Sequence, residues 1–188
     1  MSNEQDWYSG GWIQTFTGRK FFPLSPRIED VCLDDIAHAL SMICRYGGHS
    51  REFYSVAQHC CLVSDWIPEF KLEGLLHDAS EAYLGDMVRP VKHSEGMKGF
   101  REAEHRLEAL IHIQFELDMT TETAAFVKHY DNRALYTEKK FILTHQGQLM
   151  SNPVEPLPVE YLIPWTPEQA EEEFLERYYT LQRRRVSL

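Results

Sequence analysis

The chain has 188 residues, of which 43% are hydrophobic, and its formal net charge is −10 at pH 7. These values fit one globular domain and argue against a nucleic-acid partner, because binding to a phosphate backbone requires a basic face. There is no run of about 18 apolar residues and no apolar leader segment, so we expect a cytoplasmic protein without membrane contact. The four cysteines lack CxxC spacing and fit reduced thiols in that compartment.

Aromatic and polar residues alternate from Trp12 to Leu24 around Thr17-Gly18. This pattern predicts a small β-hairpin over residues 12–24, in which the glycine supplies a positive φ. A helix is expected next, because apolar residues recur at helical spacing after an acidic stretch. We expect Asp34 or its neighbour to cap this helix and Gly47-Gly48 to end it.

Apolar residues at helical spacing predict further helices up to a proline-rich segment, at about residues 54–66, 72–83, 99–117 and 121–143. Residues 151–167 predict a long loop or arm. Thr166 and Pro167 then start a last helix to about residue 184, by N-cap and first-turn chemistry. The sequence therefore predicts one mainly α domain over residues 1–188, with its helical core over residues 30–145.

An adjacent His77-Asp78 pair lies among apolar residues between Leu75 and Asp86. Buried polar groups need partners because their desolvation is costly, and a bound metal is one such partner. His59 and Asp131 lie in expected helices of their own, so that two imidazoles and two carboxylates can converge. We therefore predict a divalent metal site formed by His59, His77, Asp78 and Asp131. These ligand types suit Mn, Fe, Co, Ni or Zn, and Mg is also an option.

Glu81 follows His77 by four residues and Asp78 by three. In the expected helix these three side chains project over one sector of its surface. A metal held there can polarise a phosphoryl oxygen and lower the pKa of water, which are the requirements for hydrolysis of a phosphoester at neutral pH. The alternative for Glu81 is a solvated helix carboxylate, and the alternative for Asp86 is a simple turn with Gly85.

The order His59, His77-Asp78, Asp131 resembles the H…HD…D pattern of the HD superfamily of metal-dependent phosphohydrolases. The surrounding residues are similar to the branch that contains bacterial 5′-deoxynucleotidases and phage deoxynucleoside triphosphate hydrolases. They read CRYGGHSREFYSVAQHC and LLHDASEAYLGDMVRPVK. The resemblance extends from about Trp12 to about Glu138 and implies an HD-type helical bundle, in a bacterial cell or a phage-infected host.

The resemblance also implies roles in catalysis. Glu81 would orient or deprotonate the attacking water, and Asp86 would act as a general acid or support the site from behind the ligands. Relatives in this superfamily form dimers or larger rings, so we expect a homo-oligomer.

A substrate site is implied as well. Arg45 and Tyr46 match an Arg followed by an aromatic residue in the deoxynucleotidases, where the Arg grips a phosphate and the ring packs on a sugar without a 2′-hydroxyl. The bacterial nucleotidases carry Trp where this chain has Tyr46. The alternative for Arg45 is a cation at a helix C-terminus, favoured by the helix dipole. His49, after two glycines, is expected to approach an anion, and Lys92 to reach the phosphates unless it is an ordinary surface lysine.

The hairpin supplies the remaining predicted substrate contacts. Arg19 and Lys20 are expected to hold β- and γ-phosphates, which favours a triphosphate. Trp12 and Ile13 are expected to line a purine pocket, as in the phage dATP hydrolases. The alternative is that this aromatic hairpin packs on the helical core.

We therefore expect metal-dependent hydrolysis of a small-molecule deoxyribonucleotide. The first hypothesis is a dATP or dNTP triphosphohydrolase, and the alternative is a 5′-deoxynucleotidase that acts on dNMPs. Two further hypotheses are a cyclic-nucleotide or alarmone phosphodiesterase and a nucleotide sensor without catalysis.

Overall fold

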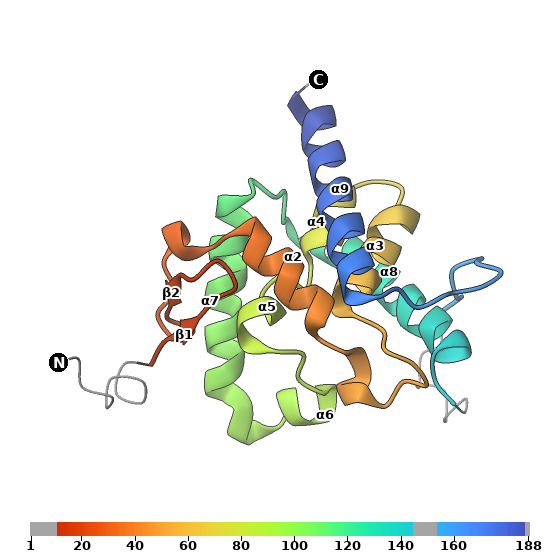
Figure 1. The fold of residues 1–188 in the computed structure, drawn as a ribbon, viewed down its shortest axis with the longest axis horizontal. Coiled ribbons are helices and arrows are strands. Elements are labelled where there is room, and N and C mark those ends of the chain that lie inside the picture. Colours follow the sequence, from red (N-terminus) through yellow and green to blue (C-terminus); the bar gives the residue numbers. More distant parts are fainter. Residues whose placement is uncertain (1–10, 145–153, 187–188) are drawn as a thin grey trace.

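The computed structural model describes residues 11–144 and 154–186. The chain is mainly helical, with a two-stranded antiparallel sheet near the N-terminus (Figure 1). This confirms the fold class predicted from the sequence. Residues 154–166, the described part of the predicted arm, contain no helix or strand. Residue 145 of the predicted core and residues 151–153 of the arm lie outside the described residues.

The predicted hairpin consists of β1 (Ile13–Gln14) and β2 (Lys20–Phe21), with Ile13 opposite Phe21. Gly18 in the connecting turn has a φ of 82°, which is the role predicted for it. Phe21 is fully buried, and its ring stacks on Tyr83 with the ring centroids 4.0 Å apart. The hairpin is thus attached to the helices through a core residue.

The other elements are helices and short 3₁₀ turns. In chain order they are η1 (Ile28–Asp30), α2 (Leu33–Met42), η2 (Arg45–Gly48), α3 (Val56–Trp66), α4 (Lys71–Leu76), α5 (Glu81–Leu84), α6 (Arg89–Lys92), η3 (Glu95–Met97), α7 (Lys98–Gln114), α8 (Thr121–Phe141) and α9 (Pro167–Val186).

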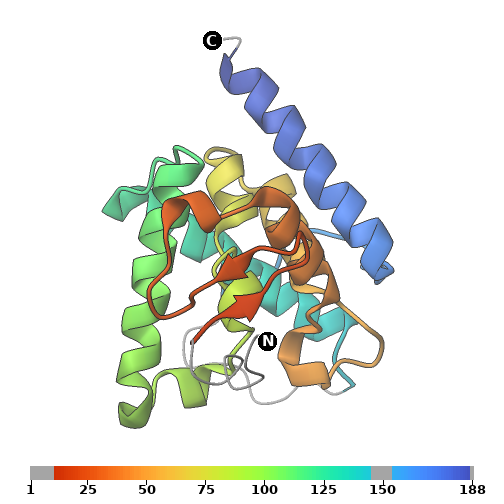
Figure 2. The ribbon, with the colours of Figure 1, turned by 60° about the vertical axis from the view of Figure 1, so that its left-hand side comes forward.

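Helix α3 is the centre of the packing. Nine of its 11 residues are buried, and α2, α4, α8 and α9 all contact it. Figure 2 shows α9 running across one side of the other helices, with its C-terminal end projecting beyond them. A helix covered on several sides presents polar side chains to the protein rather than to water, so each must find a partner there.

The predicted first helix is shorter in the structure and is capped differently. It begins after Cys32, which makes no side-chain capping bond, and the predicted cap at Asp34 or its neighbour was wrong. The Asp35 carboxylate instead accepts hydrogen bonds from the backbone N and Oγ1 of Thr17, at 2.7 and 3.0 Å. These two hydrogen bonds attach the hairpin to α2, and they do not cap the helix.

Helix α2 also ends at Met42, before Arg45 and Tyr46. Residues 43–45 are drawn into pairing with residues 54–56, since Arg45 N donates to Tyr54 O at 2.9 Å and Val56 N donates to Ile43 O at 3.0 Å. Arg45 and Tyr46 therefore lie in the separate turn η2, and Tyr46 has a left-handed φ of 60°.

The predicted helix over residues 72–83 is interrupted. Residues 77–80 form a turn between α4 and α5, so the prediction that His77 and Asp78 lie inside a helix was wrong. Bonds with three-residue spacing, from Ala79 N to Leu76 O and from Glu81 N to Asp78 O, wind this turn more tightly than an α-helix. The tighter winding changes the directions of the two side chains.

The start of α9 follows its predicted chemistry. Thr166 Oγ1 accepts from Gln169 N at 3.2 Å, while Gln169 Oε1 accepts from Thr166 N at 3.1 Å, and Pro167 is the first helical residue. Among the described residues, no helix is long and apolar enough to span a membrane.

Replacing Phe174 in α9 by Ala tests whether this helix belongs to the core. Its side chain is fully buried in the main hydrophobic cluster, so we expect a loss of about 3–5 kcal/mol in the free energy of unfolding. Tyr179 lies on the same helix but is 51% exposed, and Tyr179→Ala should cost no more than about 0.5 kcal/mol. Urea denaturation followed by circular dichroism measures both, and equal effects would contradict this packing.

Candidate metal centre

The His59 imidazole enters the site from the buried face of α3. It is fully buried, and its Nδ1 lies 2.5 Å from Oε1 of Glu138. Burial alone would raise the pKa of Glu138, but the charges of Arg45 and His59 outweigh it and lower that pKa to about 2. Glu138 is therefore an ionised acceptor, and Nδ1 carries the proton it accepts. In the neutral imidazole this leaves the lone pair on Nε2.

The Nδ1 atom of His77 is also engaged in a hydrogen bond, but its partner is a backbone carbonyl and not a carboxylate. This Nδ1 donates to the carbonyl of Gly74 at 2.8 Å, and a carbonyl oxygen can only accept. In the neutral imidazole the lone pair is again on Nε2, which lies 3.3 Å from Nε2 of His59. Burial lowers the pKa of His77, but the charge of Asp78 outweighs it and raises that pKa well above its ordinary value. Two lone pairs that face each other at this distance need a proton or a cation between them. Fixing the outer ring nitrogen is how metal-binding histidines are commonly oriented.

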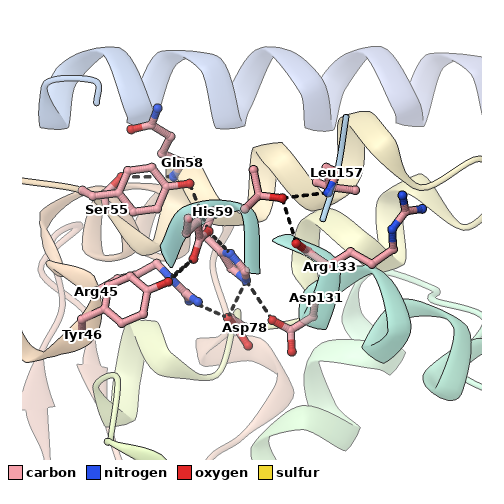
Figure 3. A network of polar contacts seen from close by, with 12 residues as sticks. Arg45, Tyr46, Ser55, Gln58, His59, Asp78, Asp131, Arg133 and Leu157 are labelled. Carbon is pink, nitrogen blue, oxygen red and sulfur yellow. Dashed lines mark hydrogen bonds and ion pairs between the residues drawn. The ribbon is translucent and has the colours of Figure 1, made fainter. Parts of the chain in front are cut away.

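Two carboxylates adjoin these nitrogens, as Figure 3 shows for His59, Asp78 and Asp131. Asp78 Oδ2 lies 3.2 Å from Nε2 of His77 and 3.7 Å from Nε2 of His59, and Asp131 Oδ1 lies 3.2 Å from Nε2 of His59. The donor atoms of His59, His77 and Asp78 all lie within 4.8 Å of one another. Asp131 contacts this cluster through His59. The three-residue cluster is compatible with a divalent metal, with Asp131 beside it.

Both carboxylates are charged in this setting. Burial alone would raise the pKa of Asp78 and of Asp131, but the neighbouring imidazoles outweigh it and hold each pKa below its ordinary value. The two groups are therefore acceptors at neutral pH, which is the state a metal requires of its ligands.

Glu81 and Asp86 have the opposite electrostatic character. Glu81 is 9% exposed, and within the described residues its Oε2 is buried without a hydrogen-bond partner. Burial, followed by the charges of Asp78 and Asp86, raises the pKa of Glu81 well above its ordinary value. Burial and Asp78 also raise the pKa of Asp86. Carboxyls shifted toward neutrality beside ionised ones are suited to proton transfer.

A cleft of about 700 Å³ opens over the cluster, which is within the usual size of a small-molecule site. Asp78, Glu81, Asp86 and Asp131 line it, together with residues of η2, α6, α7 and α8. Cationic side chains are numerous in this lining: Arg45, Arg89, Lys92, Arg101, Lys128 and Lys139.

Three of the predicted substrate residues line the cleft. Arg45 is 8% exposed, with Nη1 3.5 Å from Asp78 Oδ2 and Nε 3.3 Å from Glu138 Oε2. The Tyr46 hydroxyl donates to Glu138 Oε2 at 2.6 Å. Lys92 Nζ lies 2.6 Å from Oε1 of Glu104, which is itself buried. Arg45 is therefore not a cation at the end of α2, which stops at Met42. Lys92 is not a free surface lysine, because it is paired with Glu104.

The other predicted substrate residues lie outside the lining of this cleft. Arg19 Nη1 donates to the carbonyl of Glu29 at 3.2 Å, and Lys20 Nζ lies 4.5 Å from the ring centroid of Trp12. Ile13 is 40% exposed on β1, and His49 is exposed at the end of η2. The lining of the cleft therefore includes none of the five residues Trp12, Ile13, Arg19, Lys20 and His49.

Glu138, Arg89 and Lys128 were not among the site residues predicted from the sequence. Glu138 follows Asp131 by seven residues and Lys128 precedes it by three, so all three project from one side of α8. That spacing was the available signal. Arg89 Nη2 lies 3.2 Å from Asp131 Oδ2, and Lys128 Nζ contacts the same oxygen.

No family model matches the chain. It is 36% identical over 175 residues to "Uncharacterized protein YfdR" of Escherichia coli (strain K12), an alignment that covers 90% of this chain and 95% of YfdR. It is also 38% identical over 116 residues to "Uncharacterized protein RCAP_rcc00048" of Rhodobacter capsulatus, covering 56% of this chain and 59% of that protein. The similarity to YfdR therefore extends over nearly the full length of both chains.

Replacing Asp78 by Asn tests the metal centre without changing the size of the side chain. Mn²⁺ at a hundred times its Kd should stabilise the wild-type fold by about 2.7 kcal/mol, a rise in Tm of about 5–10 °C. The variant should lose most of this shift, because the amide supplies no charge to the cluster. Asp118→Asn changes an exposed side chain and is the matched control. Differential scanning calorimetry with and without Mn²⁺ measures the shift, and an unchanged response in Asp78→Asn would exclude the site.

Proposed function

The chain belongs to the family of YfdR. We propose that it is a metal-dependent phosphohydrolase of the HD type that acts on free deoxyribonucleotides. The substrate that we propose first is dATP or another dNTP. The observation that carries this proposal is the pair of facing Nε2 atoms of His59 and His77, 3.3 Å apart beside Asp78. They adjoin a cleft whose lining also includes the buried carboxyl group of Glu81 and several cationic side chains.

The proposed reaction divides among the residues of the cleft. His59, His77, Asp78 and Asp131 would hold the metal, which when bound supplies a Lewis acid for a phosphoryl oxygen and for water. Glu81 takes the proton of the water whose oxygen attacks phosphorus. As the bond from phosphorus to the leaving oxygen breaks, Asp86 supplies a proton to that oxygen or supports Glu81.

Cations near Asp131 support a triphosphate substrate. The hairpin residues Arg19 and Lys20 do not line the cleft, and Arg89 and Lys128 are the cations that would hold several phosphates. Their side chains are 45% and 56% exposed, and both contact Asp131 Oδ2 on the cleft side of the cluster. Arg45 and Lys92 also line the cleft, but each is paired with a buried glutamate, so Arg89 and Lys128 are the more accessible cations for phosphate oxygens.

A 5′-deoxynucleotidase is the second candidate, because Arg45 and Tyr46 lie side by side in the lining of the cleft. That pair would suffice for one phosphate and a sugar without a 2′-hydroxyl. The described cysteines are free thiols, in keeping with the cytoplasmic location we propose. The homo-oligomeric assembly stays a prediction.

The substrate class is tested by a panel of deoxy- and ribonucleoside mono-, di- and triphosphates, with Mn²⁺, Co²⁺, Mg²⁺ and Zn²⁺ supplied in turn. We expect hydrolysis of dATP or another dNTP, measured as release of phosphate, pyrophosphate or triphosphate. Hydrolysis of dNMPs alone would make the protein a 5′-deoxynucleotidase. If the protein binds nucleotides but hydrolyses none of them, the sensor hypothesis is favoured. Hydrolysis of cyclic nucleotides or alarmones, tested as a second panel, would favour a phosphodiesterase.

Glu81→Gln separates catalysis from metal binding. The variant keeps the size of the side chain but cannot accept the proton of water, so kcat should fall by about 10²- to 10⁴-fold. The metal Kd should stay close to the wild-type value. Glu102→Gln is the control, since it makes the same change at an exposed position on α7. Steady-state kinetics beside metal titration calorimetry measure both quantities, and wild-type kcat in Glu81→Gln would remove Glu81 from the reaction.

A further inference from the structure

Glu138 is a carboxylate that the proposed reaction does not use. Its side chain is fully buried on α8, two helical turns after Asp131. A carboxylate without water is costly unless several partners compensate it, so its contacts identify what it holds in place.

The two oxygens of Glu138 have different partners. Oε1 lies 2.5 Å from Nδ1 of His59 and accepts from the Tyr54 hydroxyl at 3.1 Å. Oε2 accepts from the Tyr46 hydroxyl at 2.6 Å and lies 3.3 Å from Nε of Arg45. One oxygen therefore faces a metal-ligand candidate, and the other faces the turn η2 that lines the cleft.

The contact with His59 determines which ring nitrogen faces the cluster. Nδ1 of His59 lies 2.5 Å from Oε1 of Glu138, so this nitrogen is the one that shares a proton with the carboxylate, and in the neutral ring Nε2 presents its lone pair toward His77 and Asp78. A hydrogen bond from the outer ring nitrogen also fixes the plane of the imidazole.

The contact with η2 acts on a strained segment. Tyr46 has a φ of 60°, in the left-handed region that non-glycine residues seldom adopt. Such a conformation persists where the surroundings impose it, and here the hydroxyl of Tyr46 is held by Glu138 while the adjacent Arg45 is paired with the same carboxylate. Figure 3 shows Arg45 and Tyr46 on one side of His59 and Asp131 on the other, with Asp78 between the Arg45 guanidinium and Asp131.

We propose that Glu138 is a positioning residue that orients His59 toward the metal through one oxygen and holds the Arg45–Tyr46 turn at the cleft through the other. The second half rests on the proposed function, because it assigns that turn to substrate. The first half concerns the metal alone and stands without any hydrolytic activity.

Glu138→Gln tests both halves in the full-length chain. The amide keeps the volume, but its neutral oxygen is a weaker acceptor for Nδ1 of His59 and makes that imidazole a less basic metal ligand, while its NH₂ group cannot accept from Tyr46. We expect the Kd for Mn²⁺, measured by titration calorimetry, to rise by about 10- to 100-fold, as when other hydrogen-bond partners of metal ligands are removed. The KM for the nucleotide hydrolysed by the wild type should rise as well.

Two matched variants separate the two oxygens. Tyr46→Phe removes only the contact from Oε2, so it should raise the KM and leave the Kd for Mn²⁺ at the wild-type value. Tyr54→Phe removes a neutral donor to Oε1 at a residue that does not line the cleft. It should lower the Tm and leave both the Kd for Mn²⁺ and the KM unchanged.

A lower Tm in Glu138→Gln with wild-type affinity for Mn²⁺ would overturn the first half and reduce Glu138 to a structural role. An unchanged KM in Tyr46→Phe would overturn the second half. Should Glu138→Gln fail to fold, nitrogen NMR of the wild-type histidines decides the first half. At a pH where the His59 ring is neutral, a proton on Nδ1 supports it, and a proton on Nε2 overturns it. If the wild type binds Mn²⁺ but hydrolyses nothing in the panel, the proposed function and the second half fail together, while the first half is still decided by the affinities.

Discussion

The arrangement of this molecule depends on one buried polar contact, between His59 and Glu138 in the middle of the helical core. His59 lies on α3, the helix that α2, α4, α8 and α9 surround, and both side chains are fully buried. An imidazole at such a position destabilises the core unless its nitrogens are satisfied. Glu138 satisfies Nδ1, and Nε2 is left to face His77, Asp78 and Asp131. The same helix packing that forms the core thus creates the polar cluster.

Negative charge surrounds His59 on both ring nitrogens. Asp78, from the turn after α4, and Asp131, from α8, adjoin Nε2, while Glu138, also from α8, adjoins Nδ1. Arg45 compensates Asp78 and Glu138, while Arg89 and Lys128 compensate the cleft side of Asp131. Among the described residues no lysine or arginine pairs with the facing nitrogens of His59 and His77, and a divalent ion suits that position in the cluster.

The sequence predicted the helices and the metal-ligand candidates but not the turns that aim them. Periodicity found α3 and α8, because their apolar faces repeat at helical spacing. It joined α4 to α5, because bonds of three-residue spacing leave the same apolar pattern as a helix. Likewise, the end of α2 depends on pairing between residues 43–45 and 54–56, which a local pattern does not contain. The likeness of the hairpin to purine-binding segments placed Trp12 and Ile13 at a cleft whose lining they do not join.

The raised pKa of Glu81 connects the metal centre with proton transfer. Burial raises this pKa first, and the negative charges of Asp78 and Asp86 raise it further. Once a divalent ion shares the charge of Asp78, the repulsion that favours protonated Glu81 becomes weaker, and its pKa falls toward the ordinary range. The metal ligand Asp78 and the proton acceptor Glu81 are therefore linked through their charges, because whatever reduces the negative charge of Asp78 also favours the ionised form of Glu81.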